Sequence, residues 1–149
     1  MASSGRLPNS PYLLVNSYFR AEDLISKAGR NYIFNIGSLI GHQLELDTED
    51  MKRESDINVT NVLSYNYSIE LQIPDGYYVE NVDALNYNIV SDLAEFTAKA
   101  TIDGNIIRVN TSKKYKTLYA SKDDWNKYID FLEAAYEFSQ KKIIIKKNK

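Results

Sequence analysis

The stretch Tyr65-Asn-Tyr-Ser-Ile-Glu-Leu-Gln-Ile73, followed by Pro74-Asp75-Gly76, decides the fold. Aromatic or aliphatic side chains alternate with polar ones along all nine residues before the proline. A period of two over this length is typical of a half-buried antiparallel strand. Pro-Asp-Gly favours a turn, because proline presets φ and glycine allows a positive φ. We therefore predict a strand that ends in a turn, inside an organising region at residues 65–111.

Other strands are expected on both sides of this run. Two alternating runs flank Asp103-Gly104, and this pattern favours a hairpin with a type I′ turn, which needs a positive φ at both central residues. The segment 57–63 is expected either to continue into the strand that starts at Tyr65 or to be broken from it by a bulge. We also predict a short helix at 21–28 and, at 38–50, a strand fragment that runs into a loop. The remaining strands are predicted at residues 12–19, 31–36, 77–80, 85–90, 94–102, 106–112 and 115–119.

The pattern changes to a helical one after Ser121, a residue that can cap a helix N-terminus. A helix is expected to run to about Phe138 and to dock on the sheet, because it carries one apolar stripe. Lysines flank Ile143–Ile145 in a last strand at 141–147, as expected for a strand protected against edge-to-edge association. The stripe consists of Trp125, Tyr128, Ile129, Leu132 and Tyr136.

These patterns predict a mainly β (α+β) fold: an antiparallel β-sandwich-like domain with one C-terminal α-helix followed by a final strand. The length of 149 residues favours one domain. We expect residues 1–11 to be a flexible lead or a cloning remnant, and residues 12–149 to form the single β-rich domain.

Composition narrows the function classes. The chain has no cysteine, which excludes disulfides, thiolate zinc sites and a cysteine nucleophile. The formal net charge is −2, so no global field attracts nucleic acid. No apolar run approaches the roughly 20 residues that span a bilayer, and residues 1–11 lack the apolar segment of a secretory signal. We expect either a cytoplasmic protein or a piece of a longer exported chain.

Several side chains are candidates for a chemical role. His42 is the one imidazole, and no Gly-x-Ser-x-Gly elbow accompanies it, so an ordinary loop histidine is expected. The acidic cluster at 45–50 lacks the spacing of a calcium loop and is interpreted as a solvated face. The glycines of Gly37-Ser-Leu-Ile-Gly41 do not form a phosphate-binding loop. We expect no catalytic residue, no metal, no cofactor and no nucleic acid.

Twelve tyrosines are the most unusual feature of the composition. With asparagine they can form a platform on which a sugar ring stacks, because the tyrosine ring has an apolar face and a polar tip. Tyr65, Tyr67, Tyr87, Tyr128 and Tyr136 are expected on buried stripes. The tyrosines left free for a ligand or partner are Tyr77, Tyr78, Tyr115 and Tyr119.

Three stretches together carry a family resemblance: residues 28–41, residues 67–82 and residues 128–147 with its Glu-Ala-Ala-Tyr-Glu-Phe core. The chain resembles the C-terminal β domain of unknown function that follows a transglutaminase-like (papain-fold) core in bacterial exported multidomain proteins. The resemblance covers roughly residues 12–147 and implies a periplasmic or cell-surface parent chain. The Cys-His-Asp triad of such a core cannot be carried over, because this chain has no cysteine.

The expected function is therefore a non-catalytic accessory or interaction module of a transglutaminase-like or peptidase-like multidomain protein, and not an enzyme. Its partner would be the neighbouring transglutaminase-like domain of the parent chain, with no membrane insertion. The alternative is a stand-alone glycan- or peptide-binding β domain.

Overall fold

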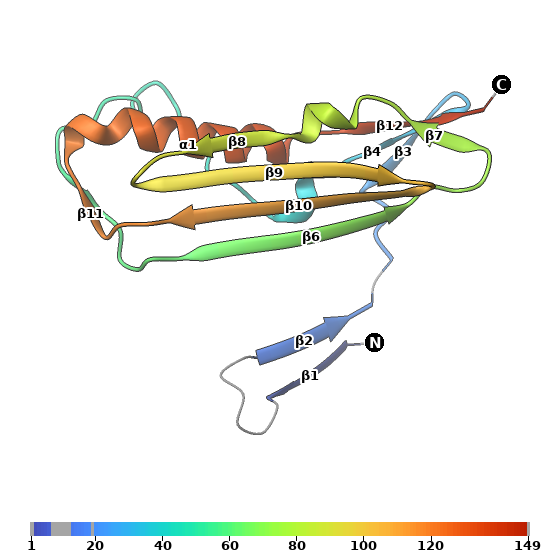
Figure 1. Ribbon diagram of the computed structural model, residues 1–149, viewed down its shortest axis with the longest axis horizontal. Helices are drawn as coiled ribbons and strands as arrows, with labels where there is room; N and C mark the ends of the chain where they lie inside the picture. The colour runs from blue at the N-terminus through green and yellow to red at the C-terminus, as the bar shows by residue number, and fades with distance from the viewer. Residues whose placement is uncertain (1, 7–12, 19, 149) are drawn as a thin grey trace.

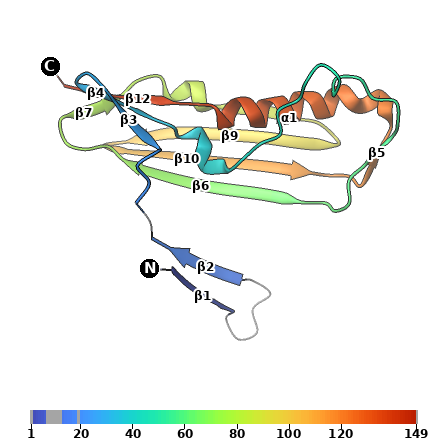
Figure 2. The same cartoon turned by 180° about the vertical axis from the view of Figure 1, so that it is seen from behind.

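The computed structural model describes residues 2–6, 13–18 and 20–148. Two antiparallel four-stranded sheets and one helix make up most of it, which confirms the predicted mainly β fold with one C-terminal helix (Figures 1 and 2). The first sheet has the order β6 (Ser64–Gln72), β10 (Ile106–Tyr115), β9 (Ala94–Asp103) and β8 (Tyr87–Val90). The second has the order β3 (Ile25–Ala28), β4 (Asn31–Phe34), β12 (Ile143–Lys147) and β7 (Tyr77–Val79).

Two short strand pairs and three 3₁₀ helices complete the described structure. The pair β1 (Ala2–Arg6) and β2 (Leu13–Ser17) forms a hairpin, and β5 (Ile57–Asn58) pairs with β11 (Tyr119–Ala120). Residue 1 and residues 7–11 of the predicted lead, and residues 12 and 19 of the predicted first strand, lie outside the described residues. The 3₁₀ helices are η1 (Gly37–Ile40), η2 (Val82–Leu85) and η3 (Lys122–Asp124).

The helix α1 (Trp125–Ser139) covers one face of the first sheet (Figures 1 and 2). Before it, the Ser121 hydroxyl accepts a hydrogen bond from the Asp123 amide at 3.2 Å and caps η3, which leads directly into α1. The helix α1 itself begins after Asp124 without a side-chain cap. The buried stripe is rotated from the predicted one, because the most buried residues are Phe131, Ala135 and Phe138. Of the predicted stripe, Tyr128 and Leu132 are buried as expected, while Trp125, Ile129 and Tyr136 are only half-buried.

The hydrophobic core lies between the first sheet and this helix and extends to the second sheet. In the helix-facing register row, Tyr67, Thr111, Ala98 and Tyr87 follow one another across the four strands. The ring of Phe138 lies 5.8 Å from Phe96 and 5.9 Å from Tyr87, in edge-to-face contacts that attach the end of the helix to the sheet.

Several local predictions are wrong. The segment predicted as a helix at 21–28 instead contains β3, because a hairpin at Gly29 (φ 64°) lets its backbone bond to β4. Residues 38–50 contain no strand, since η1 and a loop occupy them. The hairpin loop between β9 and β10 is Gly104-Asn105 with a positive φ at Gly104 alone, which is the pattern of a type II′ turn and not type I′.

Strand pairing also corrects the predictions for two other segments. Strand β12 lies between β4 and β7, so its lysines do not protect a sheet edge as predicted; Lys146 pairs with Glu80 instead. The predicted strand at 57–63 is reduced to Ile57–Asn58, which pairs with β11. Beyond it, the Val59 amide donates to the Leu118 carbonyl and the Leu63 carbonyl accepts from the Tyr115 amide, but these single bonds do not extend the strand. The turn at Pro74-Asp75-Gly76 is confirmed by the bond from the Tyr77 amide to the Pro74 carbonyl at 3.1 Å.

The Tyr128 hydroxyl is the one fully buried side-chain polar atom without a hydrogen-bond partner among the described residues. We expect Tyr128→Phe to raise the free energy of unfolding by about 1 kcal/mol, because it removes an uncompensated polar group and keeps the ring. Urea unfolding measures the change. Tyr119→Phe is the control, since Tyr119 is 69% exposed and should show no change. Destabilisation by Tyr128→Phe would contradict the expectation.

Candidate functional site

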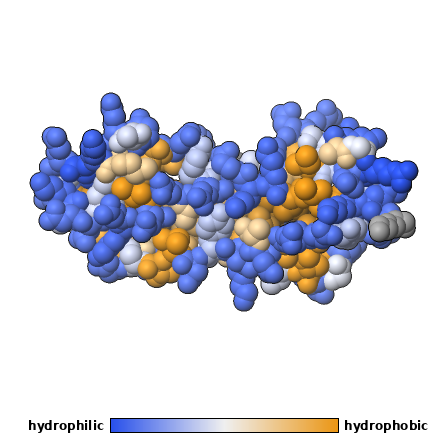
Figure 3. Space-filling view, turned by 90° about the horizontal axis from the view of Figure 1, so that it is seen from above, coloured by the Kyte–Doolittle hydropathy of each residue, from blue (hydrophilic) through white to orange (hydrophobic). Residues whose placement is uncertain are grey.

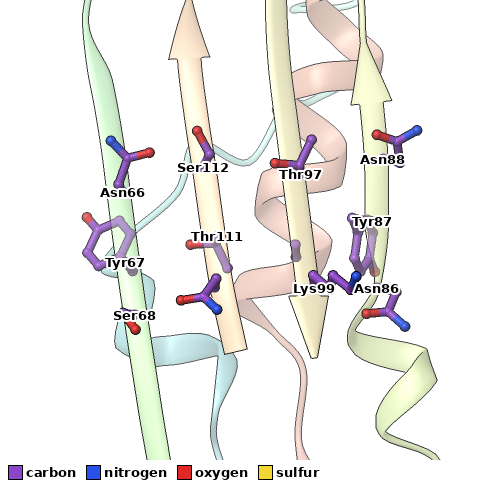
Figure 4. Close-up of a pocket in the computed structure, with 12 residues that line it drawn as sticks. Asn66, Tyr67, Ser68, Asn86, Tyr87, Asn88, Thr97, Lys99, Thr111 and Ser112 are labelled. Atoms are coloured by element: carbon purple, nitrogen blue, oxygen red, sulfur yellow. The ribbon is translucent and has the colours of Figure 1, made fainter. Parts of the chain in front are cut away.

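The uncovered face of the first sheet carries a shallow depression with a volume of about 820 Å³. Figure 4 looks onto the four strands at this place, with the helix behind them. Side chains at every second position of each strand point away from the helix, so the cross-strand register arranges them in rows. One row consists of Asn66, Ser112, Thr97 and Asn88. The next consists of Ser68, Asn110 and Lys99.

These rows are rich in amides and hydroxyls and poor in charge. Lys99 is the one charged side chain that lines the depression, and no ion pair is found for it within the described residues. At the sheet edge, the Asn86 side chain accepts a bond from the Ala100 amide at 2.8 Å. Amides and hydroxyls both donate and accept hydrogen bonds, and removing them from water costs less free energy than removing an ion. This face can therefore bind a polar surface.

The four tyrosines predicted as free lie at opposite ends of the molecule (Figure 1). Tyr77 and Tyr78 belong to β7, whereas Tyr115 ends β10 and Tyr119 begins β11. Tyr77 is half-buried against Tyr32, with ring centroids 5.7 Å apart, and Tyr78 is 41% exposed. The structure does not bring the four rings together as one platform.

Exposed apolar residues do not form one continuous surface on the side shown in Figure 3. They lie there in separate patches between hydrophilic side chains. Large apolar or aromatic groups also come to the surface at the start of β6 and near β11. These are Val62, Leu63, Tyr65, Leu118 and Tyr119.

A second cavity, of about 540 Å³, lies on the helix-facing side of the first sheet. It is bounded by the ends of β6 and β10, by the loop that follows η1, and by the residues after β5. Tyr65, predicted to be buried, is 44% exposed and lines it. The polar side chains around it are His42, Gln43, Asn58, Tyr65, Tyr67, Thr111, Lys113 and Tyr115.

Lys113 is the unusual residue of this cavity, because it occupies a helix-facing position of β10, in line with Val109 and Thr111. Its Nζ donates a hydrogen bond to the Gln43 Oε1 at 2.8 Å and lies 5.3 Å from the centre of the Phe131 ring. The Gln43 Nε2 in turn donates to the Ile40 carbonyl at 3.1 Å, which fixes the orientation of the amide. No carboxylate forms an ion pair with Lys113 in the described part of the chain.

Sequence reasoning missed Lys113, Gln43 and Thr111 as site residues. The sequence did contain a signal for Lys113. This lysine directly follows the strand predicted at 106–112, and it continues the inward-facing alternation of Ile107 and Val109. Gln43 carried no signal, because it lies in a loop.

Burial lowers the pKa of the Lys113 ammonium, so the folded chain releases this proton at a lower pH than the unfolded chain. Between the two pKa values the unfolded chain binds more protons, and stability rises with pH. We expect the free energy of unfolding of the wild type to increase relative to that of Lys113→Met as the pH rises towards the ordinary lysine pKa of about 10.4. Urea unfolding at several pH values measures it.

The control for this titration is Lys114→Met, since Lys114 is exposed on the opposite face of β10 and should follow the wild type. Burial raises the pKa of the neighbouring Tyr115, which acts in the opposite direction at higher pH, but this residue is present in all three proteins. A difference between wild type and Lys113→Met that stays constant with pH would contradict the expectation.

In the acidic loop at 45–50, the carboxylates of Asp47 and Asp50 bond to backbone amides of the loop itself. The Asp47 Oδ1 accepts the amides of Glu49 at 2.8 Å and Asp50 at 2.9 Å, and the Asp50 Oδ2 accepts the Asp47 amide at 3.0 Å. Within residues 2–6, 13–18 and 20–148 no group of three acidic or histidine side chains is placed to hold a metal ion. His42 is exposed at the rim of the second cavity.

Comparison with known proteins gives one match. The model of the family described as "Domain of Unknown Function with solved-structure structure (DUF3858)" matches residues 31–145. No curated protein and no solved structure matches the chain. None of the helices in the described residues is both long and apolar enough to span a membrane.

Proposed function

This chain belongs to the DUF3858 family, whose description states no function, and from that premise we propose that it is a non-catalytic accessory module of a multidomain protein. It docks a transglutaminase-like core of the same parent chain through the uncovered face of the first sheet. The observation that carries the proposal is the double row of amide and hydroxyl side chains across four strands. The core partner and a periplasmic or cell-surface location come from the resemblance of residues 12–147.

The chemistry of the face indicates the surface that would cover it. Ion pairs flank the rows, since Arg108 contacts Glu70 at 3.0 Å and Asp103 at 3.3 Å. Lys99 has no such partner within the described residues. A matching surface is polar, accepts and donates hydrogen bonds, and places an acidic side chain opposite Lys99, because opposite charges across an interface fix its register.

The test uses the transglutaminase-like domain encoded in the same reading frame. It is added to the isotope-labelled chain, and amide shifts are followed by NMR. We expect the shifts to gather at Thr97, Lys99 and Asn110. Asn110→Arg should weaken binding by at least about tenfold, because it places a bulky charge in the centre of the face. Gln72→Arg, exposed at the far end of the same face, is the matched control.

Three results would overturn the docking role: a reading frame without such a core, shifts elsewhere on the molecule, or normal binding by Asn110→Arg. The non-catalytic part is tested separately by assaying this chain alone for amidase and transamidation activity. Turnover that disappears in His42→Ala would overturn it.

A stand-alone glycan- or peptide-binding domain is the second candidate. The second cavity favours it, because Tyr65, Tyr67 and Tyr115 line one partly open space with both apolar and polar walls. NMR titration with a panel of oligosaccharides and short peptides tests it. Shifts at Tyr115 would support it, and the absence of shifts at Tyr77, Tyr78, Tyr115 and Tyr119 would count against it.

A further inference from the structure

The second cavity contains a positively charged side chain, Lys113, for which the described residues provide no acidic partner. The Lys113 ammonium has three donors, and one of them is used by the Gln43 Oε1 at 2.8 Å. The rings of Phe131 and Tyr115 lie 5.3 Å and 5.7 Å from the Nζ and limit the water that can solvate it. Such a charge is costly to bury unless an anion compensates it.

The remaining lining resembles that of a small-molecule site. Ile40, Val59, Leu63 and Phe96 supply apolar walls, and none of the lining residues is acidic. A volume of about 540 Å³ lies within the range usual for pockets that take small ligands. Ligand pockets combine apolar walls with a few well-placed polar groups. Here these groups are the Lys113 ammonium, the hydroxyls of Thr111 and the tyrosines, the Gln43 and Asn58 amides and the His42 ring at the rim.

We propose that this cavity binds a monoanionic carboxylate attached to an apolar body, with Lys113 contacting the carboxylate and Phe96 and Leu63 contacting the body. A single lysine matches one negative charge, whereas phosphate sites generally use several donors, such as a helix N-terminus or an arginine fork. Gln43 is a positioning residue, because it holds the ammonium through its fixed amide. The inference does not depend on the docking role of the outer face.

The experiment titrates the labelled full chain with phenylacetate and, separately, with phenylacetamide, followed by NMR. We expect phenylacetate to shift the Gln43 side-chain amide and the Thr111 and Lys113 backbone amides. Phenylacetamide should bind at least about tenfold more weakly, because it keeps the ring and loses the charge. A short peptide that ends in phenylalanine, with a free or an amidated C-terminus, distinguishes a peptide carboxylate from a free acid.

Variants separate the role of Lys113 from general effects. Lys113→Met should reduce phenylacetate affinity by at least about tenfold, and Lys114→Met on the opposite face should leave it unchanged. Dispersed amide spectra verify folding, and the acid-against-amide comparison on the wild type needs no variant at all. The inference fails if neither free acid nor free-ended peptide shifts the cavity amides, if acid and amide bind equally, or if Lys113→Met binds phenylacetate normally.

Discussion

Gly37→Ala is expected to lower the free energy of unfolding by about 3 kcal/mol or more. A Cβ at this position would lie 2.0 Å from the Phe138 carbonyl oxygen and 2.7 Å from the Ser139 carbonyl carbon and oxygen. These are backbone atoms, so no side-chain rotation relieves the overlap, and η1 must move away from the end of α1. Because domains are stable by only about 5–15 kcal/mol, this loss is a large part of the total.

The same substitution should also weaken ligand binding in the second cavity. Gly37 begins η1, and the loop that follows η1 carries Gln43, which orients Lys113. Urea unfolding measures the stability loss, and the phenylacetate titration measures the effect on the cavity.

Gly29→Ala is the matched control for Gly37→Ala. No atom lies within 4 Å of a Cβ built at Gly29, so the cost is limited to its positive φ of 64°. We expect Gly29→Ala to lower the free energy of unfolding by about 1 kcal/mol. Equal destabilisation by the two variants would show that the close approach at Gly37 does not matter.

Phe138→Ala is expected to destabilise the chain by about 3–5 kcal/mol. The ring is fully buried and contacts Phe96 and Tyr87 of the first sheet edge to face. Truncation leaves a cavity where α1 meets the sheet, and the lost contacts are those that attach the C-terminal end of the helix. Urea or thermal unfolding followed by circular dichroism measures the change.

Phe138→Leu is the control here, since it keeps most of the apolar volume and should cost less than about 1.5 kcal/mol. If Phe138→Ala and Phe138→Leu lower the free energy of unfolding by the same small amount, the Phe138 ring does not hold the end of the helix on the sheet. If leucine is as severe as alanine, the edge-to-face geometry matters more than volume.

Local patterns predicted much of the fold. Strict alternation at 65–73 and 94–102 indicated half-buried strands, and the structure contains β6 and β9 there. Ser121 and the apolar stripe indicated the helix, and the glycine of Pro74-Asp75-Gly76 indicated the turn. These signals are reliable because steric and hydrogen-bonding preferences act within a few residues.

Long-range pairing decided the elements that were predicted wrongly. The segment 25–28 has no strong local preference, and β4 makes it a strand by offering hydrogen bonds. The helix stripe was predicted in part: Tyr128 and Leu132 are buried as expected, but the centre of the buried face lies at Phe131, Ala135 and Phe138. An apolar stripe shows which residues are apolar but not how the helix is rotated on the sheet. That rotation depends on which side chains fill the space between the helix and the sheet, where Phe131, Ala135 and Phe138 are completely buried.

The sequence by itself determined the strands with strict alternation, the C-terminal helix and the absence of cysteine chemistry, because each depends on residue type and short spacing. Only the tertiary structure decided where the candidate sites lie. Gln43 and Lys113 are separated by 70 positions and meet at 2.8 Å. The polar rows of the outer face likewise exist only through cross-strand register. The register between strands and the contacts between distant segments depend on how the whole chain packs. The periodicity of residue types along the sequence does not specify this packing.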